Sequence, residues 1–329
     1  MMPLIEIADL HVAFDDAAVL RGIDLAIHRG ETLGLVGESG CGKSVTWLAA
    51  LGLLPSHAQV TGRVQLAGED ILGAPAARLD KVRGGRVAMI FQDPASALNP
   101  VHRVGDQVAE ALVLHRGLDR QAARAQARRL FDQVGIPDAG RRLAAYPHEL
   151  SGGQNQRVMI AMALAGGPEL IVADEPTTAL DVTIQAQILD LLRDVQAETG
   201  MALVLISHDL GVIAETCARV AVMYAGRIVE DASADDLFAR PAHPYTRGLL
   251  GALPRIDGPR QRLTTIPGAV PDPRRLPPGC PFGPRCPDRA AACDASEPAL
   301  AGIDRLAARH RAACIQATRA APPAVAAFA

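Results

Sequence analysis

The chain has 329 residues and a mass of 34.5 kDa; 49% of its residues are hydrophobic, 21% are charged, and its formal net charge is −3. This length indicates about two domains. The balance of hydrophobic and charged residues excludes a disordered chain and a basic protein that coats nucleic acid. No run approaches the roughly 18 apolar residues of a membrane span. Glu6 and Asp9 interrupt the region where a signal peptide needs its apolar stretch, so a cytoplasmic location is expected.

Three short apolar runs predict strands near the N-terminus, at residues 4–10, 17–27 and 32–36. The third leads into the loop GESGCGKS at residues 37–44, and a helical pattern follows from 45 to 54. This order fits the phosphate-binding pattern G-x-x-x-x-G-K-[ST] in its strand, loop and helix context. The predicted nucleotide-contacting residues are Gly37, Ser39, Gly40, Cys41, Gly42, Lys43, Ser44 and Val45.

Each residue type in this loop has a chemical reason. Glycines let backbone N–H groups surround phosphate oxygens, Lys43 reaches the β- and γ-phosphates, and the Ser44 hydroxyl ligates Mg²⁺. The chain has two lysines against 31 arginines. A retained lysine is informative because a planar guanidinium does not replace a compact ammonium at a tight phosphate site. The alternative, a glycine-rich turn without a ligand, does not explain that lysine.

A second apolar run, residues 170–173, ends in Asp174 and Glu175. A carboxylate at the C-terminal end of a strand lies where ligands bind in open α/β sheets, so Asp174 is predicted to hold Mg²⁺. If the strand geometry persists, Glu175 points to the opposite side, so the two adjacent acids can have different roles. Glu175 is expected to act as the general base for the attacking water. The alternative is a solvated acidic strand end.

Between these elements lies the segment Ser151, Gly152, Gly153, Gln154. Ser151 and Gln154 have the spacing of a capping box, which predicts a helix at about 154–165. The exposed N–H groups of a capped helix also form an anion site. One nucleotide does not need two cradles from one chain, so this second site indicates a neighbouring chain's nucleotide.

Together these motifs resemble the ATP-binding cassette (ABC) ATPases over residues 1 to about 235. The resemblance implies an α/β P-loop cassette with a RecA-like sheet core, a helical subdomain at about 93–165, and ATP and Mg²⁺ as ligands. It also implies that Phe14 stacks on adenine, Gln92 contacts Mg²⁺ and the water, and His208 contacts the γ-phosphate. Residues 179–181, ending in Asp181, match the D-loop.

Further motifs narrow the resemblance to the ATPase subunits of bacterial dipeptide and oligopeptide importers. They are FQDP at 91–94, LNP at 98–100, YPHE at 146–149, DEPTTALD at 174–181, HPYT at 243–246, GCPF at 279–282 and PRCP at 284–287. The resemblance implies ATP hydrolysis that powers peptide import from the cytoplasmic face of the inner membrane. The implied partners are a second, non-identical ATPase subunit, two transmembrane permease subunits and an extracytoplasmic solute-binding protein, with no nucleic acid. Nickel chelates or glutathione as solute, and a soluble ABC ATPase acting in DNA repair or on ribosomes, are the alternatives.

Prolines and cysteines gather in the last part of the chain. Of 24 prolines, 15 lie from residue 241 onward, which predicts a core domain at 1–240 and a loop-rich domain at 241–329. Cys280, Cys286, Cys293 and Cys314 share this second domain with the spacing C-x5-C-x6-C-x20-C. A reducing cytoplasm disfavours disulfides, and these gaps exceed those usual for structural zinc. A [4Fe–4S] cluster is therefore expected first, Zn²⁺ second, and unligated buried thiols third.

Overall fold

The computed structural model describes residues 2–178, 180–253, 265–303 and 309–317. Two compact units interleave along the chain. The first comprises Met1–Leu4, Ile27–Thr32 and Leu66–Ile206, and the second comprises Ile5–Ala26, Leu33–Gln65 and Ser207–Ala329. In the part of the chain that is described, no helix combines the length and the apolarity that crossing a membrane requires.

A parallel sheet forms the core of the first unit. Its strands are β6 (Val87–Ile90), β7 (Leu170–Asp174) and β8 (Ala202–Ile206), with β7 between the other two. Every residue of β7 and β8 is buried, as expected for a parallel strand covered on both faces. Because Asp174 aligns with Ile206 and Ala173 with Ile90, the carboxyl ends of the three strands share one edge.

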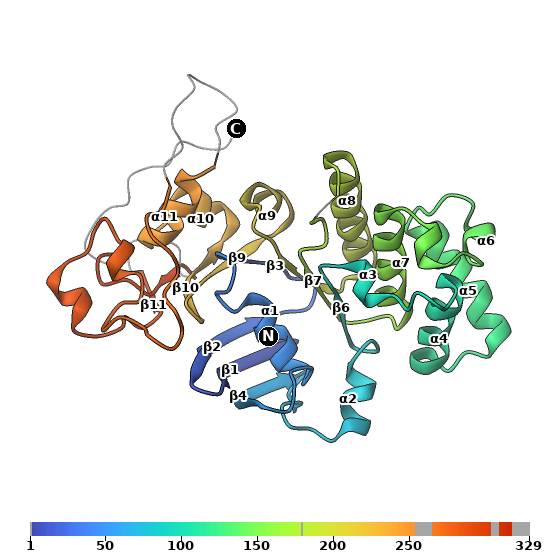
Figure 1. Cartoon of the computed structure of the whole chain (residues 1–329), viewed down its shortest axis with the longest axis horizontal. Coiled ribbons are helices and arrows are strands. Elements are labelled where there is room, and N and C mark those ends of the chain that lie inside the picture. The colour runs from blue at the N-terminus through green and yellow to red at the C-terminus, as the bar shows by residue number, and fades with distance from the viewer. Residues whose placement is uncertain (1, 179, 254–264, 304–308, 318–329) are drawn as a thin grey trace. The chain divides into compact units, whose positions relative to one another are not determined.

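Three helices of the first unit, α4 (Val104–Arg116), α5 (Arg120–Gln133) and α7 (Gly152–Ala165), pack together in the green part of Figure 1. The α5 helix places Ala127, Leu130 and Phe131 inside and its arginines outside, which is the amphipathic pattern of a surface helix. The remaining elements of this unit are β5 (Glu69–Asp70), α2 (Ala76–Val82), α3 (Pro94–Ala97), α6 (Ala139–Arg142), η1 (Pro147–Glu149) and α8 (Val182–Thr199).

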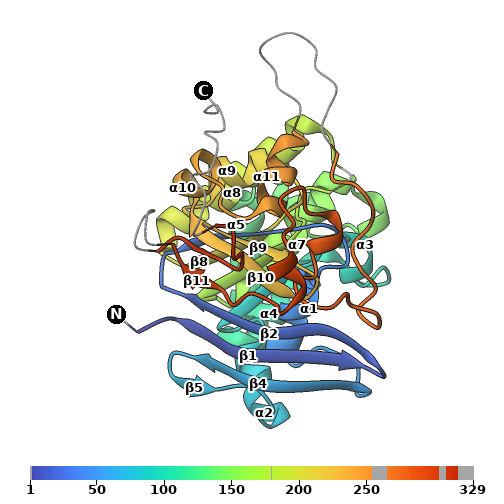
Figure 2. The same cartoon turned by 90° about the vertical axis from the view of Figure 1, so that its left-hand side faces the viewer.

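Two groups of strands build the second unit. Strands β2 (Ala17–Ile27), β1 (Ile5–Phe14) and β4 (Ala58–Leu66) lie side by side in that order (Figure 2). The other group runs β11 (Ala301–Gly302), β12 (Arg311–Ala312), β10 (Arg227–Ser233), β9 (Arg219–Tyr224) and β3 (Thr32–Val36). Among the described strands of this second group, β3 and β9 pair in parallel and the other neighbouring strands pair antiparallel. The helices are α1 (Lys43–Ala50), α9 (Leu210–Thr216), α10 (Ala234–Ala239) and α11 (Pro244–Gly251).

The predicted strands at 17–27 and 32–36 and the predicted helix at 154–165 are all present. The helix predicted over 45–54 instead begins at Lys43 and ends at Ala50. It begins earlier because Gly42, with φ 106°, turns the loop directly into the helix. It ends earlier because Gly52, with φ 62°, closes the last turn by donating to the Ala49 carbonyl.

Short elements and charged contacts characterise the described residues after 265. The helices there are η2 (Gly283–Arg285) and η3 (Ala291–Asp294), and β12 pairs with β10. Glu230 of β10 is fully buried; its carboxylate lies 2.7 Å from His310 Nε2 and accepts from the backbone N–H groups of Ala242 and His243. This paired and hydrogen-bonded charge joins three segments of the second unit.

Replacing Phe131, which is completely buried in α5, with alanine is expected to lower the free energy of unfolding by about 3–5 kcal/mol, because transfer and cavity terms add. Leu114→Ala on α4 is the control, since Leu114 is 70% exposed, and it should change stability by less than about 0.5 kcal/mol. Denaturant unfolding of both variants measures the difference. Equal losses would contradict the packing described here.

Candidate functional site

The loop at residues 37–44 depends on glycine at its two ends. Gly37 has φ 153° and Gly42 has φ 106°, which lie in the region that side chains rarely adopt. A Cβ atom on Gly37 would lie 2.3 Å from the Met223 carbonyl oxygen, and one on Gly42 would lie 2.5 Å from the Leu20 side chain. The loop therefore lies directly against β9 and β2, and neither glycine can be replaced without a shift of its neighbours.

Lys43, the first residue of α1, points back into this loop. Its side chain is buried, and Nζ donates to the carbonyl oxygens of Gly37 at 2.8 Å and Glu38 at 3.2 Å. Two carbonyls thus hold the ammonium in position before any anion arrives. Cys41 is completely buried, and burial raises the pKa of its thiol, so it is a neutral spacer and not a nucleophile.

The other predicted nucleotide contacts of the second unit lie at the ends of elements. Ser44 and Val45 are half-buried in the first turn of α1, whereas Ser39 and Gly40 are exposed. Phe14 ends β1 with its ring 5.7 Å from the His57 ring. His208 is exposed and directly precedes Asp209, which caps α9. Their predicted roles stay predictions.

In the first unit, Asp174 ends β7 as the sequence predicts, and it is buried. The expectation that Glu175 continues the strand and points to the opposite face is wrong, because Glu175 has φ 48° and the strand ends before it. The resulting turn brings Gln92 and Glu175 together: Gln92 Nε2 donates to Glu175 Oε2 at 2.9 Å. Thr178 Oγ1 donates to the same oxygen at 2.8 Å.

Thr178 is a residue that motif reading missed. The sequence could have indicated it by position, because Thr178 follows Glu175 by three residues and a turn brings such residues together. In the structure the Thr178 N–H donates to the Glu175 carbonyl at 3.2 Å. The two side-chain donors hold the carboxylate of Glu175 in one orientation. This arrangement suits a base that must meet a water molecule at a defined place.

The capping box at the start of α7 is confirmed. Gln154 N–H donates to Ser151 Oγ at 3.3 Å, and the Gln154 side chain accepts from the Ser151 N–H at 3.1 Å. Gly153 packs against α8, since a Cβ there would lie 2.9 Å from the Ile184 side chain. Asp181 caps α8 by accepting from the Ile184 N–H, and Ala179, before it, lies outside the described residues.

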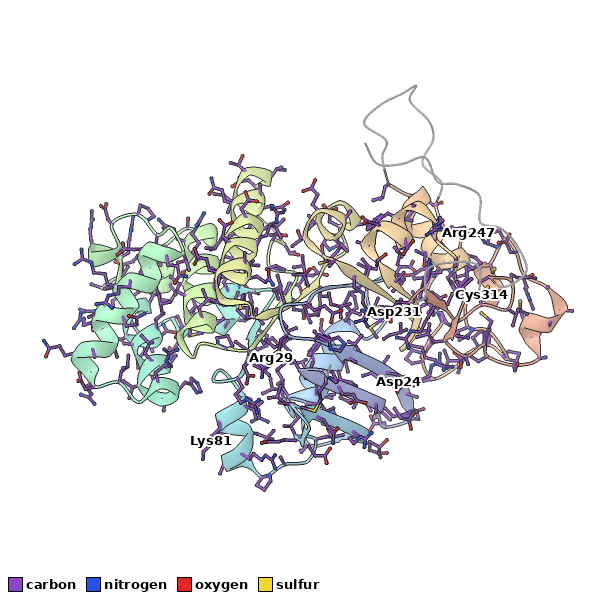
Figure 3. The ribbon with its side chains drawn as sticks, turned by 180° about the vertical axis from the view of Figure 1, so that it is seen from behind. Asp24, Arg29, Lys81, Asp231, Arg247 and Cys314 are labelled. Atoms are coloured by element: carbon purple, nitrogen blue, oxygen red, sulfur yellow. The ribbon has the colours of Figure 1, made fainter. Side chains whose placement is uncertain are left out.

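The four clustered cysteines line one pocket of the second unit, which His243, Phe282 and Asp288 also border. Cys314 reaches this pocket from the end of the described chain, in the same region as Arg247 of α11 (Figure 3). Burial raises the pKa of the thiols of Cys280 and Cys314 and raises that of Cys286 to about 11, so the thiols are neutral without a cation.

The metal expected at these cysteines finds no support in the arrangement of the ligands. Over residues 2–178, 180–253, 265–303 and 309–317, no group of three or more His, Cys, Asp or Glu side chains is arranged to hold a metal ion. The tetrahedral zinc alternative needs four ligands converging on one ion. In the described part of the chain, the cysteines share a pocket without forming such a centre.

Comparison with known proteins agrees with these features. Residues 20–178 match the family described as "ABC transporter", and residues 229–293 match "Oligopeptide/dipeptide transporter, C-terminal region". The "Dipeptide transport ATP-binding protein DppD" of Bacillus subtilis is 48% identical over 89% of this chain and 90% of that protein. The "Oligopeptide transport ATP-binding protein OppD" of Mycobacterium tuberculosis is 50% identical over 96% of this chain. This chain spans about half, 52%, of that mycobacterial protein.

Solved structures show the same fold. A dimeric ATP-binding cassette, MJ0796, bound to ADP and Pi, superposes with a TM-score of 0.63 and 26% identity over 70% of this chain and 98% of that one. The cbiO1 protein of Clostridium perfringens, part of the ABC transporter complex cbiONQ, gives a TM-score of 0.62 and 27% identity, over 72% of this chain and 91% of that one. The predicted cassette fold is therefore confirmed.

Gly37→Ala should destabilise the chain by more than about 2 kcal/mol, because it adds a clash with the Met223 backbone to the cost of a left-handed residue. Gly40→Ala is the matched control. Gly40 also has positive φ, at 80°, but no atom lies within 4 Å of its Cβ position, so the cost should be about 1–2 kcal/mol. Thermal and denaturant unfolding compare the two variants. A larger loss at Gly40 would show that the loop does not lie against β9.

Proposed function

Because this chain belongs to the ABC transporter family, we propose that it binds ATP with Mg²⁺ and hydrolyses it to power the import of dipeptides or oligopeptides. The observation that carries this proposal is the phosphate loop. Its glycines take positive φ angles that residues with side chains rarely adopt, as a loop that surrounds a phosphate requires, and two loop carbonyls orient the ammonium of Lys43.

The proposed reaction needs several different groups. From the second unit, the loop and the start of α1 bind the phosphates, Lys43 neutralises their charge, and Phe14 and His208 contact the base and the γ-phosphate. From the first unit, Glu175 accepts the proton of the attacking water, held in place by Gln92 and Thr178. The start of α7, with Ser151, serves the nucleotide of a second cassette.

The residues proposed to hold Mg²⁺ fit that ion. Ser44, Gln92 and Asp174 all offer oxygen atoms, which a hard cation prefers, and Asp174 is buried at the carboxyl end of a parallel strand. When bound, Mg²⁺ neutralises charge on the β- and γ-phosphates. The contribution of the chain is to present these oxygens.

Peptide transport rests on residues 229–293 and on the names of the relatives. We propose the partners that such an importer needs: a second, non-identical ATPase subunit, two membrane permease subunits and an extracytoplasmic solute-binding protein, with this chain at the cytoplasmic face of the membrane. The domain boundary near residue 240 is part of the same proposal. The match of residues 229–293 to a peptide-transporter region favours this function over a soluble ABC ATPase.

We also retain the iron–sulfur cluster as a proposal. Its support is the ligand chemistry: four thiols border one pocket, and the cysteines are spaced more widely than is usual for a structural zinc site. Cys280, Cys286, Cys293 and Cys314 would hold the cluster, which supplies four bonds that tie short loops together. Because burial raises the pKa of three of these thiols, loading must displace their protons.

Glu175→Gln is expected to lower the steady-state ATPase rate of the assembled transporter by on the order of 10²–10⁴-fold, because the base is lost. ATP binding should be retained, since the amide keeps the size of the side chain. Lys43→Ala should instead lose ATP binding, because no other group replaces the ammonium in the loop.

Glu198→Gln is the matched control for this charge change, since Glu198 is exposed at the end of α8. It should leave both the ATPase rate and ATP binding unchanged. Near-normal turnover of Glu175→Gln would remove Glu175 from the role of base.

Protein purified without oxygen is expected to be brown if the four thiolates hold a cluster, with about four irons per chain. Cys286→Ser should remove the colour, whereas Cys217→Ser should not, because Cys217 lies between α9 and β9 outside the pocket. Absorption spectra measure the colour, and metal analysis measures the iron and zinc content. Colourless protein, with stoichiometric zinc or without metal, would contradict the proposal.

A further inference from the structure

Glu38, the second residue of the phosphate loop, is held by residues from far along the chain. Its carboxylate makes a bidentate ion pair with Arg285, with Nη1 to Oε2 at 2.7 Å and Nη2 to Oε1 at 2.9 Å. Its backbone N–H donates to Tyr245 Oη at 2.8 Å. Its carbonyl oxygen accepts from Lys43 Nζ at 3.2 Å. Every polar group of Glu38 therefore has a protein partner.

Arg285 is itself fixed in one position. Nε donates to the Pro267 carbonyl at 2.8 Å, Nη2 lies 3.5 Å from the Gly268 carbonyl, and Nη1 also lies 3.3 Å from Tyr224 Oη. The side chain is only 6% exposed, and the ion pair with Glu38 raises the pKa of the guanidinium. The guanidinium makes these contacts with its five N–H donors, which are fixed in one plane; a lysine ammonium cannot make the same set of contacts.

An aromatic cluster supports both contacts with Glu38. The rings of Tyr224, Tyr245 and Phe282 lie 4.7–5.4 Å from one another, and the guanidinium of Arg285 lies 5.8 Å from the Tyr224 ring centre. The chain has only three tyrosines, and two of them are here. Aromatic contacts of this kind add rigidity and attract the cation. Arg285 also lies on the short turn between Cys280 and Cys286, so the cysteine pocket borders this cluster.

We propose that Arg285 and Tyr245 are positioning residues for the phosphate loop. By holding Glu38 at its carboxylate and at its backbone N–H, they keep the carbonyl oxygens of residues 37 and 38 turned toward Lys43, and so keep the loop in its phosphate-binding form. The C-terminal region thereby sets the affinity of the loop for ATP. This inference rests on the proposed ATP binding and assigns to residues outside the loop a part in it.

The test uses the full chain and titrates it with Mg²⁺–ATP in a calorimeter. Arg285→Gln is expected to weaken ATP binding on the order of tenfold, because charge-assisted pairs are the strong ones and this pair is largely buried. Arg285→Lys should not restore the affinity, since an ammonium lacks the fork. Arg289→Gln is the control for the charge change: Arg289 makes a more exposed pair with Asp294, four residues along the chain from Arg285, and the variant should bind ATP as the wild type does.

Two further variants separate positioning from loss of folding. Tyr245→Phe removes only the hydroxyl that accepts from the Glu38 N–H, and Glu38→Gln keeps the size of the side chain; each should weaken ATP binding severalfold in protein that unfolds cooperatively. The double variant Glu38→Gln with Arg285→Gln should lose no more affinity than Arg285→Gln alone, because both changes remove one interaction. Hydrogen exchange should be faster at residues 37–44 in these variants and unchanged at residues 219–224 of β9.

The outcomes distinguish the two proposals. A wild-type chain that does not bind ATP overturns the proposed function and this inference with it. A wild-type chain that binds ATP, with folded Arg285→Gln, Tyr245→Phe and Glu38→Gln variants of equal affinity, overturns only the positioning role. Faster exchange across β9 as well as the loop would assign Arg285 to general stability and likewise overturn it.

Discussion

The close approach of Gly37 to the backbone of Met223 is the constraint on which the phosphate loop depends. With no side chain at this position, the loop lies directly on β9, and the Gly37 carbonyl turns inward to receive the ammonium of Lys43. That contact in turn fixes the first residue of α1, so the start of the helix and the lysine are placed together. A charged side chain is oriented here by backbone geometry, which is available only where glycine permits it.

At the acidic end of β7, side-chain hydrogen bonds, and not glycine, orient the charged group. Asp174 keeps the strand geometry and remains buried. Glu175 instead adopts a positive φ angle, which residues other than glycine rarely adopt. The turn places the Glu175 carboxylate between two donors, Gln92 and Thr178, from before and after the strand. Strain of this kind persists where surrounding contacts determine the conformation, and it is common at functional sites.

Charged and aromatic contacts, more than a large apolar core, attach the described residues after 265 to the rest of the second unit. Glu230 binds two backbone N–H groups and His310, Arg21 binds Glu297 through two hydrogen bonds, and Arg285 binds Glu38. Such pairs are directional, so they define a position where helices and strands are short. The same directionality makes the phosphate loop sensitive to a segment about 250 residues away in sequence, because Arg285 is held by four neighbours of its own.

Local sequence patterns determined the strands, the phosphate loop and the helix start named below. The apolar runs at 17–27, 32–36 and 170–173, the glycine spacing around Lys43 and the capping box at Ser151 each involve a few neighbouring residues. They could therefore be read directly from the sequence, and the structure contains them. Only the tertiary structure decided the turn at Glu175, the hydrogen bond from Thr178, the partners of Glu38, and the sharing of one pocket by Cys280 and Cys314. The turn at Glu175, with its hydrogen bond from Thr178, departs from the regular strand before it, and the other contacts depend on which segments far apart in the sequence meet. Neither leaves a periodic signal in the sequence.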